Sequence, residues 1–394
     1  MDIFEKCGKF TRAREAIEAG IYPFFLPLED TEGTEVTING KRVIMIGSNN
    51  YLGLTTHPKV RAAAIEAIEQ FGTSCTGSRF LNGTLKLHQD LETRLAVFVG
   101  KDAALVFSTG MQVNLGAISA LIGQKDFVII DKDNHASIVD GCRLGLGQMK
   151  RYRHNDLNHL ESILKDLPAD AGKMVIVDGV FSMGGDIADL PNIVPLCQKY
   201  GARLYVDDAH SMGVLGGGRG TGAHFGLTDE VDLIMGTFSK SFASIGGFIA
   251  GDTDVIHYIQ HHARSFIFSA SLPASNLMAA MAALDIMEND PEHVKRLWRN
   301  GDKMLDGLKS LGFNIGNTKT PIIPVIIGEL DPMILTWHLL LERGVYTNPV
   351  IPPAVPPNQT LLRTSYMATH TEEQLDTVLD VFAETGRQLG LIPN

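Results

Sequence analysis

Short apolar runs alternate with helical patterns through the middle of the chain. Seven of these runs have the length of strands, and several of them contain two or three β-branched residues. The expected strands are residues 103–107, 127–131, 149–152, 174–178, 203–207, 232–237 and 247–251. Apolar strands that alternate with helices indicate a largely parallel sheet with both faces covered. The pattern therefore predicts a large α/β domain over residues 46–285.

The pattern changes at both ends of the chain. Residues 1–45 predict an amphipathic helix over residues 10–19, a proline-containing arm and a β-hairpin that turns at Asn39 and Gly40. From residue 286, a long amphipathic helix, strands at 321–327 and 361–366 and a closing helix predict a smaller α+β domain that extends to residue 394. Thr371 and Gln374 form a capping-box pattern at the start of the closing helix.

Composition narrows the class of protein. A chain of 394 residues that is 44% hydrophobic and 20% charged suits a globular protein with a sizeable core. The net charge of −11 argues against a nucleic-acid-binding surface. No apolar run approaches the ~20 residues that cross a bilayer, and the N-terminal residues do not resemble a secretory signal. The four cysteines are scattered, which favours free thiols over a zinc site. We therefore expect a cytoplasmic protein without a bound metal.

Polar side chains follow four of the expected strands. They are Asp207 and His210 after one strand, Thr237, Ser239 and Lys240 after a second, His135 after a third, and Ser108, Thr109 and Gly110 after a fourth. Ligands bind at the carboxyl ends of strands in sheets of this kind, so these side chains are expected to meet. Taken singly, each has an ordinary structural explanation: Lys240 as a solvated lysine, His135 as a helix cap and Asp207 as a turn residue.

Together, the four groups match the needs of pyridoxal 5'-phosphate (PLP). This cofactor requires a lysine for covalent attachment, an acid at its ring nitrogen, a group against its ring and a cradle for its phosphate. A helix that starts at Gly110 would offer free N–H groups to the phosphate, and glycine lets the backbone approach closely. The combination favours a PLP enzyme over four unrelated polar residues.

Four motifs resemble those of the α-oxoamine synthase family, a group of fold-type-I PLP-dependent transferases that join an amino acid to an acyl-CoA. They are residues 49–53 (Asn-Asn-Tyr-Leu-Gly), 133–137 (Asp-Asn-His-Ala-Ser), 206–210 (Val-Asp-Asp-Ala-His) and 236–240 (Gly-Thr-Phe-Ser-Lys). The resemblance extends over nearly the whole chain. It implies a mostly parallel central sheet in a PLP-binding large domain and a smaller α+β C-terminal domain.

The resemblance also implies roles for individual residues. Lys240 would be the Schiff-base lysine and then the base that removes the Cα proton of the substrate. Asp207 would pair with the pyridinium nitrogen, and His210 would hydrogen-bond the 3-hydroxyl group of the ring. His135 would stack on the face of the ring, and Ser182 would support the same edge.

Further residues are implied to bind the phosphate and the substrate. The phosphate would be held by Gly110, Met111, Thr237 and Ser239 and, in a homodimer with shared active sites, by Ser269 and Ser271 of the other subunit. Arg363 and Asn49, together with His135, would bind the amino-acid substrate. Ile351 stands where some family members have an arginine that helps to hold the substrate, so carboxylate binding is expected to depend mainly on Arg363.

Residues 77–84, 350–356 and 362–370 most resemble bacterial family members that condense L-serine with a long-chain acyl-CoA, releasing CO2 and CoA. Contact with a membrane surface, from which a lipid substrate could be collected, stays open. Two alternatives also stay open. One is a family member that joins alanine to pimeloyl-CoA. The other is a non-catalytic partner subunit, which Lys240 argues against because a scaffold does not need a Schiff-base lysine.

Overall fold

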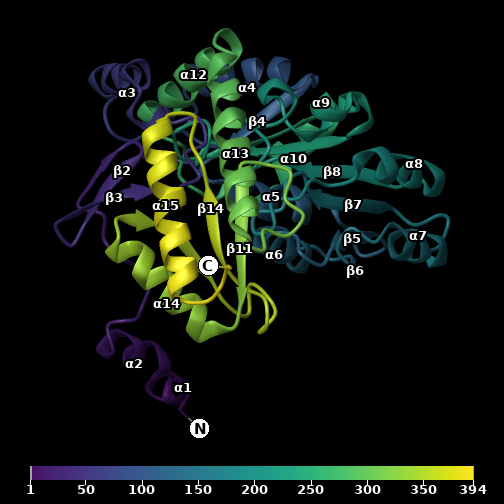
Figure 1. Ribbon diagram of the computed structural model, residues 1–394. Coiled ribbons are helices and arrows are strands. Elements are labelled where there is room, and N and C mark those ends of the chain that lie inside the picture. The colour runs from purple at the N-terminus through teal and green to yellow at the C-terminus, as the bar shows by residue number, and fades with distance from the viewer. Residues whose placement is uncertain (1, 394) are drawn as a thin grey trace.

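A seven-stranded sheet forms the centre of the larger part of the molecule (Figure 1). The structure is a computed structural model that describes residues 2–393. The strands are β4 (Ala103–Phe107), β5 (Phe127–Asp131), β6 (Gln148–Tyr152), β7 (Lys173–Asp178), β8 (Arg203–Asp207), β9 (Leu233–Thr237) and β10 (Gly247–Gly251). Their order is β4-β10-β9-β8-β7-β5-β6, and only β10 pairs antiparallel with its neighbours. The sequence pattern located each strand to within one residue at either end.

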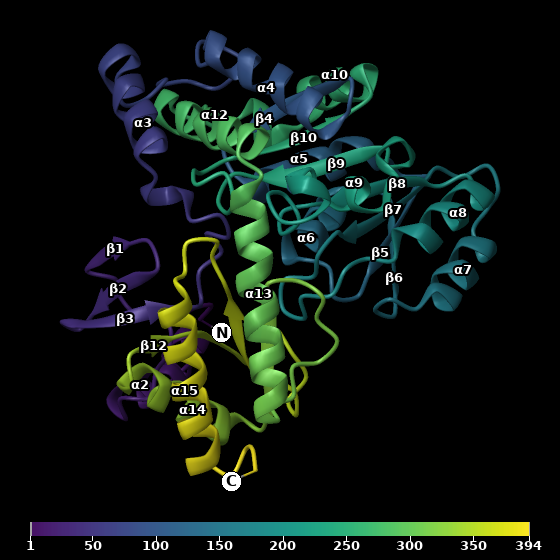
Figure 2. The ribbon, with the colours of Figure 1, turned by 45° about the horizontal axis from the view of Figure 1, so that its top comes forward.

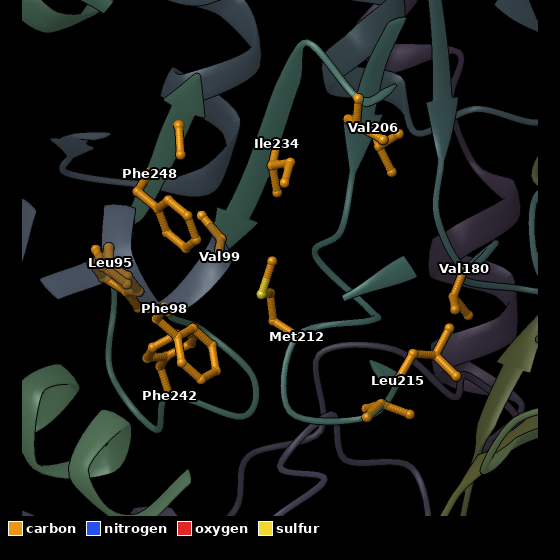
Figure 3. Close-up of a cluster of buried hydrophobic side chains, with 14 of the residues drawn as sticks. Leu95, Phe98, Val99, Val180, Val206, Met212, Leu215, Ile234, Phe242 and Phe248 are labelled. Carbon is orange, nitrogen blue, oxygen red and sulfur yellow. The ribbon is translucent and has the colours of Figure 1, made fainter. Parts of the chain in front are cut away.

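Helices cover both faces of this sheet or, like α3 on α12, pack on the helices that do. They are α3 (Pro58–Phe71), α4 (Lys86–Val99), α5 (Gly110–Leu121), α6 (Ala136–Leu144), α7 (Leu157–Asp166), α8 (Leu190–Tyr200), α9 (Thr221–Phe225), α10 (Thr253–His262), α11 (Arg264–Ile267) and α12 (Ala274–Asn289), with short 3₁₀ turns at Leu54–Thr56, Gly216–Gly218 and Thr228–Glu230. Successive residues of a strand face opposite sides, so the sheet contributes to two apolar clusters. Figure 3 shows part of one of them, in which Phe248 of β10 lies beside Leu95 and Phe98 of α4.

The C-terminal part has its own sheet and its own apolar cluster. Its elements are α13 (Glu292–Leu311), β11 (Ile322–Gly328), α14 (Leu330–Glu342), β12 (Val345–Tyr346), β13 (Asn348–Val350), β14 (Thr360–Ser365) and α15 (Glu372–Gln388). β14 lies between β11 and β13 in an antiparallel sheet, and α13 packs beside α15 (Figure 2). The capping box of α15 forms as predicted, because Thr371 Oγ1 accepts from Gln374 N and Gln374 Oε1 accepts from Thr371 N.

The N-terminal elements join the C-terminal part. They are α1 (Glu5–Gly8), α2 (Arg12–Glu18), β1 (Asp30–Glu32), β2 (Glu35–Ile38) and β3 (Lys41–Met45). The predicted hairpin turn is found, with Asn39 and Gly40 both at positive φ, and β12 extends the hairpin sheet by pairing parallel with β3. Helices α1 and α2 bury none of their residues and lie at the end of the molecule away from α3 and α12 (Figures 1 and 2).

Among residues 2–393, no helix is both long and apolar enough to cross a membrane.

The C-terminal sheet is joined to the segment after β3, because Ser365 N donates to Ile46 O and Ala368 N donates to Tyr51 O. These bonds place β14 beside the 49–53 motif, so residues from distant parts of the chain meet at one edge of the large sheet.

Candidate active site

A cavity of about 310 Å³ opens at the carboxyl ends of the central strands. Eight predicted side chains or backbone segments line it: Gly110, Met111, His135, Asp207, His210, Thr237, Ser239 and Lys240. Five others, Asn49, Ser182, Ser269, Ser271 and Arg363, are not part of its lining. The volume is at the lower end of the range for small-molecule sites. The fold therefore brings together residues from four strand ends, as the sequence predicted.

Lys240 follows β9 and is half-buried at the cavity. Burial lowers the pKa of Lys240 to about 8; the charge of Arg363 also lowers it, whereas Asp207 and Asp178 oppose the shift. At pH 7, about a tenth of amines with such a pKa carry no proton, against fewer than one in a thousand for an exposed lysine. Lys240 is thus suited to act as a nucleophile or a base.

Asp207 is buried at the end of β8, and two neutral donors orient its carboxylate. Asn114 Nδ2 donates to it at 2.8 Å and Ala209 N at 3.0 Å. The amide of Asn114 is itself fixed, because Tyr205 donates to its Oδ1 at 2.6 Å. Neutral donors fix the carboxylate without cancelling its charge, so Asp207 can stabilise a positive charge in the cavity.

Asp178, which sequence reasoning missed, lies beside Asp207 at the end of β7. Burial and the neighbouring Asp207 charge raise the pKa of Asp178 well above its usual range. The carboxyl group of Asp178 accepts from the backbone N–H of His135 at 3.2 Å. Asp178 therefore fixes the start of α6 and holds a proton up to a higher pH than an exposed aspartate would. Its position at a strand end, like that of Asp207, was the signal for it in the sequence.

His135 combines a structural position with a place in the cavity. It is the N-cap of α6, where its Nδ1 lies 2.7 Å from Ser137 Oγ and accepts from Ser137 N at 3.2 Å. His135 therefore serves as a helix cap and also lines the cavity, because the cap bonds fix its ring at the cavity wall. Its predicted stacking on a cofactor ring stays a prediction.

His210 is connected to Arg363 through the phenol of Tyr51. His210 Nδ1 lies 2.7 Å from the Tyr51 hydroxyl oxygen, to which Arg363 Nη2 donates at 3.3 Å. A guanidinium can only donate, so the hydroxyl proton points to another acceptor, and His210 Nδ1 is nearer than Asn49 Oδ1 at 3.3 Å. Burial lowers the pKa of His210 well below its usual range, as do the charges of Lys240 and Arg363. His210 is thus a neutral imidazole with its proton on Nε2.

Arg363 is a buried cation on β14 whose bonds run to neutral oxygen atoms. Its Nε donates to Ser182 O at 2.5 Å, and Nη1 donates to Ser365 Oγ at 3.5 Å. Within residues 2–393, Arg363 forms no ion pair with a carboxylate. A buried charge without a counter-ion is costly, so its neighbourhood favours an anionic ligand. Ser182 contacts Arg363 through its backbone carbonyl, and its predicted support of the cofactor ring stays a prediction.

The cavity wall formed by the start of α5 is suited to hold an anion. Thr109 caps α5 by accepting from Gln112 N, and the N–H groups of Gly110 and Met111 lack intrahelical acceptors. A Cβ at residue 110 would lie 2.7 Å from Thr237 Oγ1, so only glycine fits at this close approach. Thr237 Oγ1 and Ser239 Oγ are 3.0 Å apart beside it. A helix N-terminus with two hydroxyl groups matches a phosphate.

Ser269 and Ser271 lie near this wall but outside the cavity. Ser269 Oγ accepts from Gln112 Nε2 at 2.9 Å. Ser271 is buried, and its Oγ has no hydrogen-bond partner among the described residues. Their predicted contact with the phosphate of another subunit stays a prediction.

The site as a whole fits PLP. One cavity offers an amine with a lowered pKa, a buried and oriented carboxylate, a neutral imidazole donor and an anion-binding helix N-terminus, which are the groups that this cofactor requires. Tyr51, Asn114 and Asp178 complete the arrangement and were not assigned roles from the sequence.

Comparisons with known proteins agree with this reading. Residues 41–382 match the family described as "Aminotransferase class I and II". The chain is 52% identical over 385 residues to a serine palmitoyltransferase of Bacteriovorax stolpii, with 97% of this chain and 91% of that protein covered. It is 43% identical over 383 residues to an 8-amino-7-oxononanoate synthase of Thermoanaerobacter pseudethanolicus, with 97% of each covered. The structure is also similar to that of a solved variant of the serine palmitoyltransferase of S. paucimobilis with bound PLP-myriocin aldimine. The match covers 100% of this chain and 100% of that chain, with a TM-score of 0.97 and 39% sequence identity.

Proposed function

The chain belongs to the aminotransferase class I and II family, and we propose that it catalyses the PLP-dependent decarboxylative condensation of L-serine with palmitoyl-CoA or another long-chain acyl-CoA. The products are 3-oxosphinganine (3-ketodihydrosphingosine), CoA and CO2, and the reaction is the first step of sphingolipid synthesis. The identity of 52% to a serine palmitoyltransferase over nearly the whole chain carries this proposal. The predicted resemblance and the predicted fold class, a fold-type-I PLP-dependent transferase, are confirmed.

The residues of the site have separate tasks in this reaction. When bound, PLP withdraws the electron pair that proton removal leaves on Cα of serine. Lys240 would hold the cofactor covalently and, as a neutral amine, take the Cα proton. The Asp207 carboxylate would keep the ring nitrogen protonated, and His210 would donate from Nε2 to the ring hydroxyl. Arg363 would hold the substrate carboxylate and so orient the amino acid.

The alternative within the same family is the condensation of alanine with pimeloyl-CoA, which the 43% identity to an 8-amino-7-oxononanoate synthase keeps in view. A non-catalytic partner subunit is disfavoured, because Lys240, Asp207 and His210 are all present and meet in one cavity.

A homodimer with shared active sites is part of the proposal. Large apolar side chains are exposed on and near the cavity wall at Met111 (50%), Ile245 (47%) and Phe268 (73%). Exposed apolar surface beside a site is typical of a subunit interface. Ser269 adjoins Phe268, so a subunit seated here would lie beside both serines predicted to serve a shared phosphate site. The cytoplasmic location and contact with a membrane surface stay predictions.

The proposed reaction can be tested directly. The purified protein supplied with PLP, L-serine and palmitoyl-CoA should release CoA and CO2 in equal amounts and form the 3-keto amine, detected by mass spectrometry. Omission of serine should stop CoA release. CoA release without CO2 or the 3-keto amine would show hydrolysis of the thioester instead of condensation.

Replacing Arg363 with alanine should weaken serine binding by about 10- to 150-fold, the loss expected for a charge-assisted hydrogen bond of about 1.5–3 kcal/mol. Titration with serine, followed by the absorbance of the cofactor, measures this affinity. Arg343→Ala is a matched control, because Arg343 bonds Thr385 and Gln388 on α15 instead of the site. If Arg363→Ala binds serine as tightly as the unchanged protein, another group such as Asn49 holds the carboxylate.

A further inference from the structure

The loop between β7 and α8 carries the carbonyl group that contacts Arg363. Ser182 O accepts from Arg363 Nε at 2.5 Å. The loop is closed tightly on itself, since Gly185 N donates to Phe181 O at 2.9 Å and Phe181 N donates to Asp186 O at 3.0 Å. Because of this closure, the positions of Ser182 and Asp186 are coupled, and a group that fixes Asp186 also fixes the carbonyl that holds Arg363.

Asp186 is fixed by the loop that follows β6. Its Oδ2 accepts from His154 Nε2 at 2.8 Å and from Asn155 Nδ2 at 2.9 Å. The other ring nitrogen, His154 Nδ1, lies 3.0 Å from Asp131 Oδ1, and Asp131 is fully buried at the end of β5. The His154 ring also packs edge-on against Phe181, with 4.5 Å between ring centroids. The imidazole therefore joins the closed loop to the end of β5 in the central sheet.

The charges around His154 make it a cation. Burial alone lowers the pKa of His154, but hydrogen bonds to Asp131 and Asp186, together with their charges, outweigh burial and raise it to about 10. Asp133, whose Oδ2 is 3.7 Å from Nδ1, faces it from the solvent side, and Tyr152 contacts Asp131 from β6. Both ring nitrogens then donate hydrogen bonds. Asp131, Asp133 and His154 lie close enough together to hold a metal cation. Because both nitrogens of the His154 ring carry protons, we interpret the three residues as an ion-pair cluster and not as a metal site.

The C-terminal part fixes the same loop from the other side. Gly185 O accepts from Thr320 Oγ1 at 2.9 Å and from Thr318 Oγ1 at 3.3 Å. Gly185 has a φ of +69°, and a Cβ there would lie 2.2 Å from Ile322 O, so the fit is close. The loop is thus held between the central sheet and the strand that pairs with β14, on which Arg363 lies.

We propose that Asp186 is a positioning residue for recognition of the substrate carboxylate: its bond to His154 fixes the 181–186 loop, whose Ser182 carbonyl aims the Arg363 guanidinium. The inference rests on the proposed function in that Arg363 receives the carboxylate of the amino acid. It adds a determinant outside the cavity, because neither Asp186 nor His154 is part of the cavity lining.

The test is the effect of Asp186→Ala on three ligands of the PLP-loaded protein. Serine affinity should fall by about 3- to 30-fold, the range for coupling through an indirect contact. The affinity for 2-aminoethanol, which is serine without its carboxylate, and the KM for palmitoyl-CoA should stay unchanged. Asp133→Ala is the matched control: it removes an aspartate from the same imidazole but not from the loop, and should leave serine affinity unchanged.

A second arm tests the path through Arg363. In an Arg363→Ala background, Asp186→Ala should cause no further loss of serine affinity, because residues that act through one contact are not additive. Asp186→Asn, which keeps an oxygen for His154, should restore most of the affinity, and it replaces Asp186→Ala if that variant does not fold.

Three results would overturn the inference: unchanged serine affinity in Asp186→Ala, an equal loss for serine and 2-aminoethanol, or a full additional loss in the Arg363→Ala background. Failure of the proposed function looks different, since the unchanged protein would then bind no serine. The same comparison can in that case be made with L-alanine against ethylamine, because the inference concerns the carboxylate and not the serine hydroxyl.

Discussion

Replacing Lys240 with alanine should lower kcat by about 10²- to 10⁴-fold, the loss expected when a proton-transfer group is removed. The same change should abolish covalent capture of PLP, because the amine that forms the bond is gone. Borohydride reduction of the unchanged, yellow holoprotein should fix the cofactor permanently to one peptide. Peptide mapping by mass spectrometry should find it on Lys240.

The lowered pKa of Lys240 adds a pH dependence to this prediction. Only the unprotonated amine attacks the cofactor, so the rate of covalent capture by protein freed of PLP should rise with pH and level off above a midpoint near 8. Lys199→Ala, which removes an exposed lysine paired with Glu161, should change neither the capture rate nor kcat. A colourless protein after reconstitution, or a label on another lysine, would contradict the assignment.

Much of the fold could be predicted because its signals are local. The inner strands β5, β7 and β9 are almost entirely buried, so each appears in the sequence as a short, mostly apolar run that ends at a polar residue. The capping box at Thr371 and Gln374 and the turn at Asn39 and Gly40 likewise depend on neighbouring residues only. The short strands β12 and β13 were missed because two or three residues carry no period, and because β12 is defined by its pairing with Ile44 and Met45.

The candidate site was predictable only in part, because some of its contacts follow from local patterns and others join distant parts of the chain. Strand ends meet at one edge of a parallel sheet, so Asp207 and Lys240 could be placed together from the pattern. The contact of Tyr51 with His210 spans 159 residues, and that of Tyr51 with Arg363 spans 312. Such contacts depend on how the C-terminal sheet docks on the large one, which no local pattern encodes. Asp178 was missed although its strand also ends in aspartate.

The exposed apolar side chains near residue 80 lead to the last prediction, which concerns the acyl chain. Phe80 is 59% exposed and Leu81 is 77% exposed, and most of the 352–357 loop also faces solvent. If these surfaces receive the acyl chain, each buried CH₂ should contribute about 0.8 kcal/mol, which is about a fourfold rise in kcat/KM per carbon. Activity with serine should therefore climb steeply from short acyl-CoAs to palmitoyl-CoA.

Pimeloyl-CoA distinguishes the two family reactions because its chain ends in a carboxylate. Burying that charge without a partner costs several kcal/mol, so a surface of apolar side chains should reject it. We expect kcat/KM for palmitoyl-CoA with serine to exceed that for pimeloyl-CoA with alanine by more than about 100-fold. Leu81→Asp should flatten the dependence on chain length, whereas Val97→Asp, at an equally exposed position on α4, should not. A preference for pimeloyl-CoA with alanine would overturn the serine reading and leave the chain an α-oxoamine synthase of another specificity.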